Sequence, residues 1–195
     1  MPRIEAASIE EHVRAQTARI LEAATGLFRA QGYRKTDMDD IARAVGLARN
    51  SLYRYYRNKD FILLACVERD MGAFVEQMRN LGTEFPDPVE RLRAWLEMQI
   101  DIATSPAHAT MELIAEIRTD APELRKQLMS LHDAPGAVLE GSVGEILRGR
   151  RRDAVLVTAL IRGMVEAAAG HAMRRENKVA VKRELCRAVE RILDI

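Results

Sequence analysis

Helical periodicity runs through almost the whole of this 195-residue chain. Apolar residues recur three and four positions apart, and no stretch alternates apolar and polar residues as a half-buried strand does. Capping residues answered three positions later by an acid mark several helix starts. These pairs are Ser8 with Glu11, Thr36 with Asp39, Asp87 with Glu90, and Asp120 with Glu123. The chain is therefore predicted to be all-α, with about nine helices.

The organisation of the predicted helices changes near residue 59. Helices are expected near residues 9–31, 37–44, 48–55, 59–81, 88–104, 106–119, 121–147, 153–174 and 178–194, with a break or kink at Pro135-Gly136. The first three are joined by short links, whereas the later ones are longer and richer in aliphatic residues. We therefore expect a small amino-terminal module over 1–58, with ordered helices from about residue 9, and a helical bundle over 59–195.

Positive charge is concentrated in the amino-terminal module. The segment from Arg29 to Lys59 holds eight basic residues and three acids, although the formal net charge of the whole chain is only +1. A local basic segment on a nearly neutral body is typical of polyanion binding. A solvated basic face is the alternative interpretation of the charge alone.

Residues 36–60 have the spacing of a helix–turn–helix motif, in which two helices are joined by a tight turn. Thr36 is expected to cap the first helix, and Gly46 to end it, since glycine readily adopts the positive φ needed just past a helix. In the second helix, Leu52 and Tyr56 share the inner side. The apolar side of the first helix consists of Met38, Ile41, Ala42 and Val45.

The outer side of the second helix carries groups that suit contact with DNA. Arg49 and Asn50 can reach base edges, where a bidentate contact would discriminate between bases by ~1–3 kcal/mol. Ser51 and the flanking Tyr53 and Tyr55 can donate to phosphates. These residues predict a DNA-binding surface, although an aromatic pair at helical spacing is more often part of a core.

Lys59 follows this surface and lies in the first turn of the next helix, which Asn58 is expected to cap. Free backbone N–H groups and the positive end of the helix dipole favour a phosphate there. The Lys59 amine would add a full positive charge at the same point. The sequence therefore predicts a phosphate contact for Lys59.

The span 20–65 resembles the amino-terminal domain of TetR-family transcriptional regulators (the TetR/AcrR type). The resemblance implies phosphate contacts from Thr36, Ser51, Tyr53, Tyr55 and Lys59, and base readout near Arg49 and Asn50. Ala48 departs from the serine common in the family, and loss of that cap costs ~1 kcal/mol. The matching residues are Ala23-Ala24, Leu27-Phe28, Gly32-Tyr33, Thr36, Asp40-Ile41-Ala42, Val45-Gly46-Leu47, Ser51-Leu52-Tyr53, Tyr55-Tyr56 and Asn58-Lys59-Asp60.

The resemblance also implies a homodimer in which the last two helices of each subunit form a four-helix bundle. Two apolar stripes with alternating spacings of four and three residues suit such packing. The alternative is that both stripes pack inside one subunit. The stripe residues expected at the dimer interface are Val157, Ile161, Met164, Ala168, Val181, Leu185, Ala188 and Ile192.

The middle of the bundle is where the family binds a small hydrophobic or amphipathic effector. Methionine, tryptophan and a few polar groups are compatible with a ligand pocket. An ordinary core is the alternative for each of these residues. The expected pocket residues are Trp95, Met98, Gln99, Met111, Ile114, Met129 and His132.

Other classes of protein find little support in the sequence. No enzyme motif is present, the four histidines are scattered, and Cys66 and Cys186 lack metal or redox spacing, so no cofactor or metal is expected. No export signal is recognised and no apolar stretch approaches the ~20 residues that span a bilayer, so a cytoplasmic location away from membranes is expected.

We therefore expect a ligand-responsive, sequence-specific DNA-binding regulator. It would act as a repressor on a palindromic double-stranded operator, bind as a homodimer and be released by a small-molecule effector. One alternative is a regulator of the same fold that responds to a protein partner or to no ligand. The other is an all-α enzyme with an unrecognised site.

Overall fold

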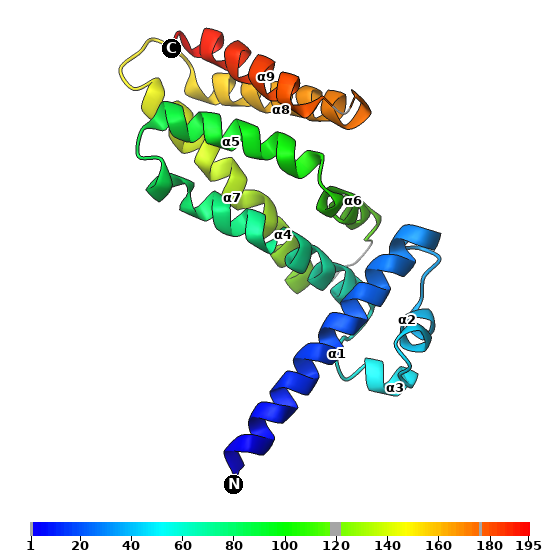
Figure 1. Ribbon diagram of the computed structural model, residues 1–195. Helices are drawn as coiled ribbons and strands as arrows, with labels where there is room; N and C mark the ends of the chain where they lie inside the picture. The colour runs from blue at the N-terminus through cyan, green and yellow to red at the C-terminus, as the bar shows by residue number, and fades with distance from the viewer. Residues whose placement is uncertain (1, 118–121, 176) are drawn as a thin grey trace. The chain divides into compact units, whose positions relative to one another are not determined.

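The computed structural model describes residues 2–117, 122–175 and 177–195, and it contains no strand in these ranges. The all-α prediction is confirmed (Figure 1). The helices are α1 (Pro2–Gln31), α2 (Met38–Ala44), α3 (Arg49–Leu52), α4 (Lys59–Glu84), α5 (Pro88–Ala103), α6 (Pro106–Glu112), the 3₁₀ helix η1 (Leu113–Glu116), α7 (Pro122–Ile146), α8 (Ala154–Arg175) and α9 (Lys178–Leu193).

The chain forms two compact units. The first consists of Met1–Asp70 with Ala109–Arg125, and the second of Met71–His108 with Lys126–Ile195. Helix α4 therefore contributes to both units, and the first unit extends past the end of the predicted amino-terminal module. The functional division between residues 58 and 59 stays a prediction.

Helix starts agree best with the sequence where a side chain caps the backbone. Asp87 caps α5 as predicted, with Oδ1 accepting from the backbone N–H groups of Val89 and Glu90 at 2.9 Å each. The cap of α2 is one residue later than predicted. Asp37, rather than Thr36, forms the capping box, and it does so with Asp40.

Three further boundaries differ from the prediction. Helix α1 begins at Pro2, so Ser8 lies inside the helix and does not cap it. Helix α3 ends at Leu52, and the residues that follow form a turn. Helix α7 continues through Pro135, so the predicted break is absent. The expected cap Asp120 lies outside the described residues.

The first unit is built around apolar side chains from four helices. Phe28 of α1 is 1% exposed, Ile41 of α2 and Leu52 of α3 are 0% exposed, and Ile62 of α4 is likewise fully buried. The ring of Phe28 packs against that of Tyr33, with centroids 5.5 Å apart. Burying a side chain of this size stabilises a fold by about 1.5–3 kcal/mol, so these contacts hold the short α2 and α3 against α1 and α4.

The second unit has a separate core, in which α5 packs against α8 and α9. Trp95 of α5 is 4% exposed, and its indole Nε1 donates to the carbonyl oxygen of Pro135 at 2.8 Å. The guanidinium of Arg91 also forms a hydrogen bond inside this unit. Its Nε donates to the hydroxyl of the fully buried Ser142 at 3.0 Å, which ties α5 to α7.

The stripes predicted for the dimer interface face the core of their own subunit. Val157 and Leu185 are each 5% exposed and Ile161 is 0% exposed, so these side chains have almost no surface left for a second subunit. The structure thus favours the alternative that both stripes pack within one subunit. The other stripe residues are partly buried, and four of them pack against the same core: Met164, Ala168, Val181 and Ile192, with Ala188 half-buried nearby in α9.

Helix α8 is more apolar than the sequence analysis recognised. Its 21 residues Ala154–Arg174 are long and apolar enough to cross a membrane. In the 18-residue stretch of this helix used for that comparison, only 22% is buried. The expectation that no stretch approaches this length was therefore wrong. Arg162 and Glu166 lie near the middle of the helix, where a bilayer would disfavour charge. Contact with protein fits this exposed apolar helix better than contact with lipid.

Candidate nucleic-acid interface

A tight turn sets α3 against α2. Gly46 has a φ of +69°, a left-handed conformation that favours glycine, and it ends α2 as predicted. The N–H of Leu47 then donates to the carbonyl of Ala42 at 2.9 Å. Ala48 precedes α3 in an extended conformation. It makes no side-chain cap, because a methyl group cannot accept a hydrogen bond. The buried Leu52 therefore holds this four-residue helix in place.

The outer side of α3 is open to solvent. Arg49 and Asn50 are exposed, Ser51 is half-buried, and Tyr53 is 41% exposed just after the helix. Tyr55 is half-buried in the turn that follows. The five residues that the sequence assigned to this helix and its flanks are therefore exposed or half-buried, and Arg49 and Tyr53 are in contact.

Tyr56, which the spacing predicts on the inner side, is half-buried, and this burial raises the pKa of its phenol above the usual value. Of the three neighbouring tyrosines, Tyr53 is the exposed one, and Tyr55 and Tyr56 are both half-buried.

Arg49 is already engaged in the absence of DNA. Its Nη1 lies 2.5 Å from Oδ2 of Asp39 on α2, and its Nη2 donates to the hydroxyl of Tyr53 at 3.3 Å. The guanidinium carbon also lies 5.7 Å from the centroid of the Tyr53 ring. The hydrogen bond to Tyr53 and the negative charge of Asp39 both raise the pKa of Arg49. Sequence reasoning assigned no role to Asp39 beyond a cap partner.

Thr36 is enclosed by the protein, so the structure does not support the phosphate contact that the resemblance implied for it. The residue is 0% exposed. Its hydroxyl donates to the carbonyl of Gly32 at 2.9 Å and accepts from Nε2 of Gln31 at 3.2 Å. A fully buried hydroxyl cannot touch a phosphate, and this one instead fixes the loop between α1 and α2.

Lys59 is held by the same loop. Its Nζ donates to the carbonyls of Tyr33 and Thr36 at 3.0 Å each and to that of Arg34 at 3.5 Å, and it lies 4.4 Å from the centroid of the Tyr33 ring. An ammonium group has three N–H donors, and three carbonyls accept from it here. We call this arrangement the Lys59 cage. A phosphate contact would require the amine to give up part of the cage.

The start of α4 is fixed by the neighbours of Lys59. Asn58 caps the helix as predicted, because its Oδ1 accepts from the N–H groups of Asp60 and Phe61 at 3.0 and 3.2 Å. The Tyr33 hydroxyl donates to the Asp60 carboxylate. The first turn of α4 and the loop after α1 are therefore joined from two sides, by an amine and by a carboxylate.

The expected effector pocket falls in different parts of the chain. Trp95, Met98 and Gln99 belong to the second unit, where Trp95 and Met98 contribute to the core and Gln99 is half-buried. Met111 and Ile114 belong to the first unit and are half-buried. The side chains of Met129 and His132 lie outside the described residues. The pocket stays a prediction.

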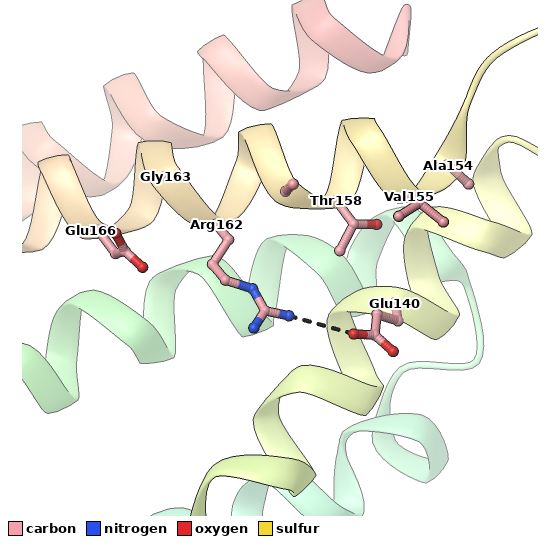
Figure 2. Close-up of a pocket in the computed structure, with 8 residues that line it drawn as sticks. Glu140, Ala154, Val155, Thr158, Arg162, Gly163 and Glu166 are labelled. Carbon is pink, nitrogen blue, oxygen red and sulfur yellow. Dashed lines mark hydrogen bonds and ion pairs between the residues drawn. The ribbon is translucent and has the colours of Figure 1, made fainter.

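A groove of about 680 Å³ lies beside α8 in the second unit (Figure 2). Arg162 reaches across it to Glu140 of α7, with Nη2 and Oε1 3.4 Å apart. The five predicted pocket residues whose side chains the structure describes do not line this groove. Its lining is Glu140, Ala154, Val155, Thr158, Ala159, Arg162, Gly163 and Glu166.

Similar proteins share both the sequence and the fold. The chain is 24% identical over 146 residues to the fatty acid metabolism regulator protein of Bacillus subtilis, covering 75% of each chain. It is 26% identical over 164 residues to the HTH-type transcriptional repressor Rv1474c of Mycobacterium tuberculosis, covering 76% of this chain and 85% of the relative. The crystal structure of AibR in complex with isovaleryl coenzyme A and operator DNA aligns with a TM-score of 0.67 and 22% identity, over 88% of this chain and 96% of that one.

The fold and the surface of α3 together define a helix–turn–helix DNA-binding transcriptional regulator. Residues 20–66, which contain the whole motif, match the family described as bacterial regulatory proteins, tetR family. This match identifies residues 20–66 as a DNA-binding domain of the TetR type.

Proposed function

We propose that this protein is a ligand-responsive repressor that binds a palindromic operator as a homodimer, with α3 of each subunit in the major groove. The exposed Arg49 and Asn50 on a helix held by the buried Leu52 carry this proposal. In a dimer of this kind the two recognition helices enter successive major grooves, with centres ~34–36 Å apart.

Contacts to the DNA divide between bases and backbone. Arg49 and Asn50 reach base edges, whereas Ser51, Tyr53 and Tyr55 donate to phosphates and set the orientation of α3. Lys59 supports this surface indirectly, because its cage fixes the loop before α2 to the start of α4. Thr36 is given no direct contact with DNA because it is fully buried.

The exposed face of α8 supplies the dimer contact in this proposal. Val155 is 80% exposed, Leu156 is 57% exposed and Leu160 is 52% exposed. Gly163 and Ala167 continue the same exposed side and let a second helix approach closely. Leu156, Leu160, Gly163 and Ala167 each lie one position before a residue of the predicted stripe, so they face about 100° away from it.

The outer side of α9 supports a contact centred on α8. Five of its exposed residues are charged: Lys178, Arg183, Glu184, Arg187 and Arg191. Charged residues are depleted at the core of an interface, and they are common at its rim. We therefore place α8 at the centre of the dimer contact and the outer side of α9 at its edge.

An acyl-coenzyme A is the effector class that the relatives favour. One relative is named for fatty acid metabolism, and a solved structure of the same fold contains isovaleryl coenzyme A. Such a thioester is amphipathic, as the sequence analysis expected of the effector. A ligand that binds the folded protein at 100 times its Kd stabilises it by ~2.7 kcal/mol. A thermal-shift series over acyl chain lengths therefore tests this part of the proposal.

The remaining features follow from action on DNA. We propose residues 1–58 as the DNA-binding domain and 59–195 as the dimerisation and effector domain, in a cytoplasmic protein that regulates transcription and catalyses no reaction. A regulator of the same fold that answers to a protein partner is the second candidate, because the same α8 face would also suit such a partner.

Selection of bound fragments from random double-stranded DNA tests the function. The purified protein should enrich an inverted repeat whose half-sites lie about one helical turn apart, or a multiple of that distance. Binding to the recovered site should weaken steeply as salt rises, because phosphate contacts release counterions. Recovery of no common sequence after repeated rounds would contradict the proposal.

A further inference from the structure

An acid on α2 holds the arginine that faces the DNA. Asp39 lies ten positions before Arg49, and its carboxylate Oδ2 is 2.5 Å from Nη1 of that arginine. Both side chains are partly open to solvent, at 42% for Asp39 and 56% for Arg49. The pair therefore spans the two helices of the motif at its outer surface.

The second terminal nitrogen of Arg49 is held from another side. Nη2 donates to the Tyr53 hydroxyl at 3.3 Å, and the guanidinium lies near the ring of the same residue. Asp39 and Tyr53 thus fix the guanidinium from two directions, and we call this arrangement the Arg49 brace. The raised pKa of Arg49 agrees with these two partners.

The brace leaves donors free for a base. A guanidinium has five N–H donors in a planar fork, and two of them are used in the brace. Three donors remain for the O6 and N7 acceptors of guanine, the base that arginine most often reads with two bonds. Because a long side chain loses conformational entropy when it is ordered, an arginine ordered in advance loses less on binding.

We infer that Asp39 is a specificity-determining positioning residue, which orients Arg49 toward one guanine without contacting the DNA itself. The inference rests on the proposed function, since it requires α3 to lie in the major groove. It places part of the sequence discrimination on α2, outside the recognition helix.

The charge of Asp39 gives this role a distinctive signature. A carboxylate near the phosphates opposes binding to any DNA sequence, so its removal should strengthen non-specific binding. Removal of the brace should at the same time weaken the preference for guanine at the position that Arg49 reads. The two effects have opposite signs, and no general loss of folding produces both.

The nearby charges do not replace Asp39. Asp40 is committed to the capping box with Asp37. Its Oδ1 also lies 3.4 Å from Nη1 of Arg43, and its Oδ2 accepts from Nε2 of Gln31 at 3.4 Å. Arg43 is the neighbouring cation on α2. Asp39 also adds negative charge in the first turn of α2, where it interacts favourably with the helix dipole and stabilises the helix. The thermal stability of each variant is therefore measured first.

The experiment uses the full-length protein and DNA duplexes. The probes are the sequence selected by the wild type, a set with each base pair of one half-site replaced, and a scrambled duplex. Dissociation constants are measured for the wild type, Asp39→Ala, Asp39→Glu, Arg49→Ala and the double variant Asp39→Ala with Arg49→Ala. Glu22→Ala serves as a matched control, because it also removes an exposed acid paired with an arginine, in this case Arg69.

The expected result is a loss of discrimination confined to one base pair of the half-site. Asp39→Ala should lower the preference there about fivefold or more and bind scrambled DNA more tightly than the wild type. Arg49→Ala should lose no further preference when Asp39→Ala is added to it. Asp39→Glu should retain part of the preference. Glu22→Ala should match the wild type.

Two outcomes overturn the inference and are distinguishable from failure of the proposed function. If Asp39→Ala strengthens binding to all duplexes and leaves every preference unchanged, Asp39 only neutralises charge. If Arg49→Ala changes no base preference, Arg49 is not a base reader and the brace has no role in specificity. If the wild type itself selects no sequence, the proposed function fails first.

Discussion

The helix–turn–helix and the α8–α9 pair are both helical, yet the sequence identified the outward surface of only one of them. In α3, Leu52 is the one fully buried residue, and the residues beside it on the outer side are polar. In α8, apolar or small residues surround most of the helix, so spacing alone does not separate the buried face from the exposed one. A surface is predictable when the two sides of a helix differ in chemistry.

The predicted and the proposed dimer faces of α8 differ by one residue. The predicted stripe begins at Val157 and Ile161, which are buried, whereas the exposed stripe begins at Leu156 and Leu160. Both follow the same spacing, and a shift of one residue turns a helical stripe by about 100°. The resemblance implies a dimer contact on these helices, but only burial within the subunit separates the two faces.

Leu160→Glu tests the α8 face and should have the largest effect. A carboxylate buried in an apolar interface without a partner costs several kcal/mol, so the dimer should dissociate and affinity for the selected operator should fall by ~100-fold or more. Light scattering after size-exclusion chromatography measures the mass. Ile9→Glu, at another exposed apolar residue, is the control and should remain dimeric. A dimeric Leu160→Glu protein would remove this face from the interface.

Arg49→Ala tests the surface of α3. Loss of a bidentate contact to a base should cost ~1–3 kcal/mol on the selected operator and abolish the preference at one base pair of each half-site. Binding to scrambled DNA should weaken far less. Asn50→Ala is the matched variant and should affect a neighbouring base pair. Equal losses on selected and scrambled DNA would mean that Arg49 contacts phosphate.

Lys59→Met tests whether the Lys59 amine binds the carbonyls of the cage or a phosphate of the DNA. Three carbonyls lose their charged donor, so the free energy of unfolding of the first unit should fall by about 1–3 kcal/mol. Affinity should fall for all DNA sequences, and its dependence on salt should keep the wild-type slope. Arg57→Met removes an exposed cation two positions earlier and serves as the control. Unchanged stability with a salt slope flatter by about one would restore the phosphate contact.

Ala48→Ser should have the smallest effect, and it should be favourable. Ala48 has φ −68° and ψ 146°, an extended conformation that a capping serine adopts. A hydroxyl there can accept from the free N–H groups at the start of α3, which should raise stability by about 0.5–1 kcal/mol. Differential scanning calorimetry measures the shift, with Ala137→Ser on the exposed side of α7 as the control. No rise in Tm would show that α3 is held by Leu52 alone.

Local chemistry explains what the sequence predicted well. Caps, turns and the order of the helices depend on residues within a few positions of one another, as Asp87 and Gly46 show. The capping box of α2 was misplaced by one residue, because Thr36 and Asp37 are both good capping residues and both have an acid three positions later. Only the burial of Thr36 separates the two choices.

Contacts between distant residues explain what the sequence missed. The Lys59 cage joins residues 23 to 26 positions apart, and the Arg49 brace reaches ten positions back to Asp39. Each partner taken alone looks like an ordinary surface charge. The role of Asp39 could have been predicted from its place in the basic segment. An acid surrounded by cations in the sequence is expected to pair with one of them in the fold.

The central claim is that the outer side of α3 reads DNA sequence, and a double variant, Arg49→Ala with Asn50→Ala, tests it most directly. Fluorescence anisotropy gives the ratio of dissociation constants for scrambled and selected duplexes at one salt concentration. We predict a ratio of ~10³ or more for the wild type and a ratio near one for the folded double variant, which should keep salt-sensitive, non-specific binding. A double variant that retains the wild-type ratio would contradict the account.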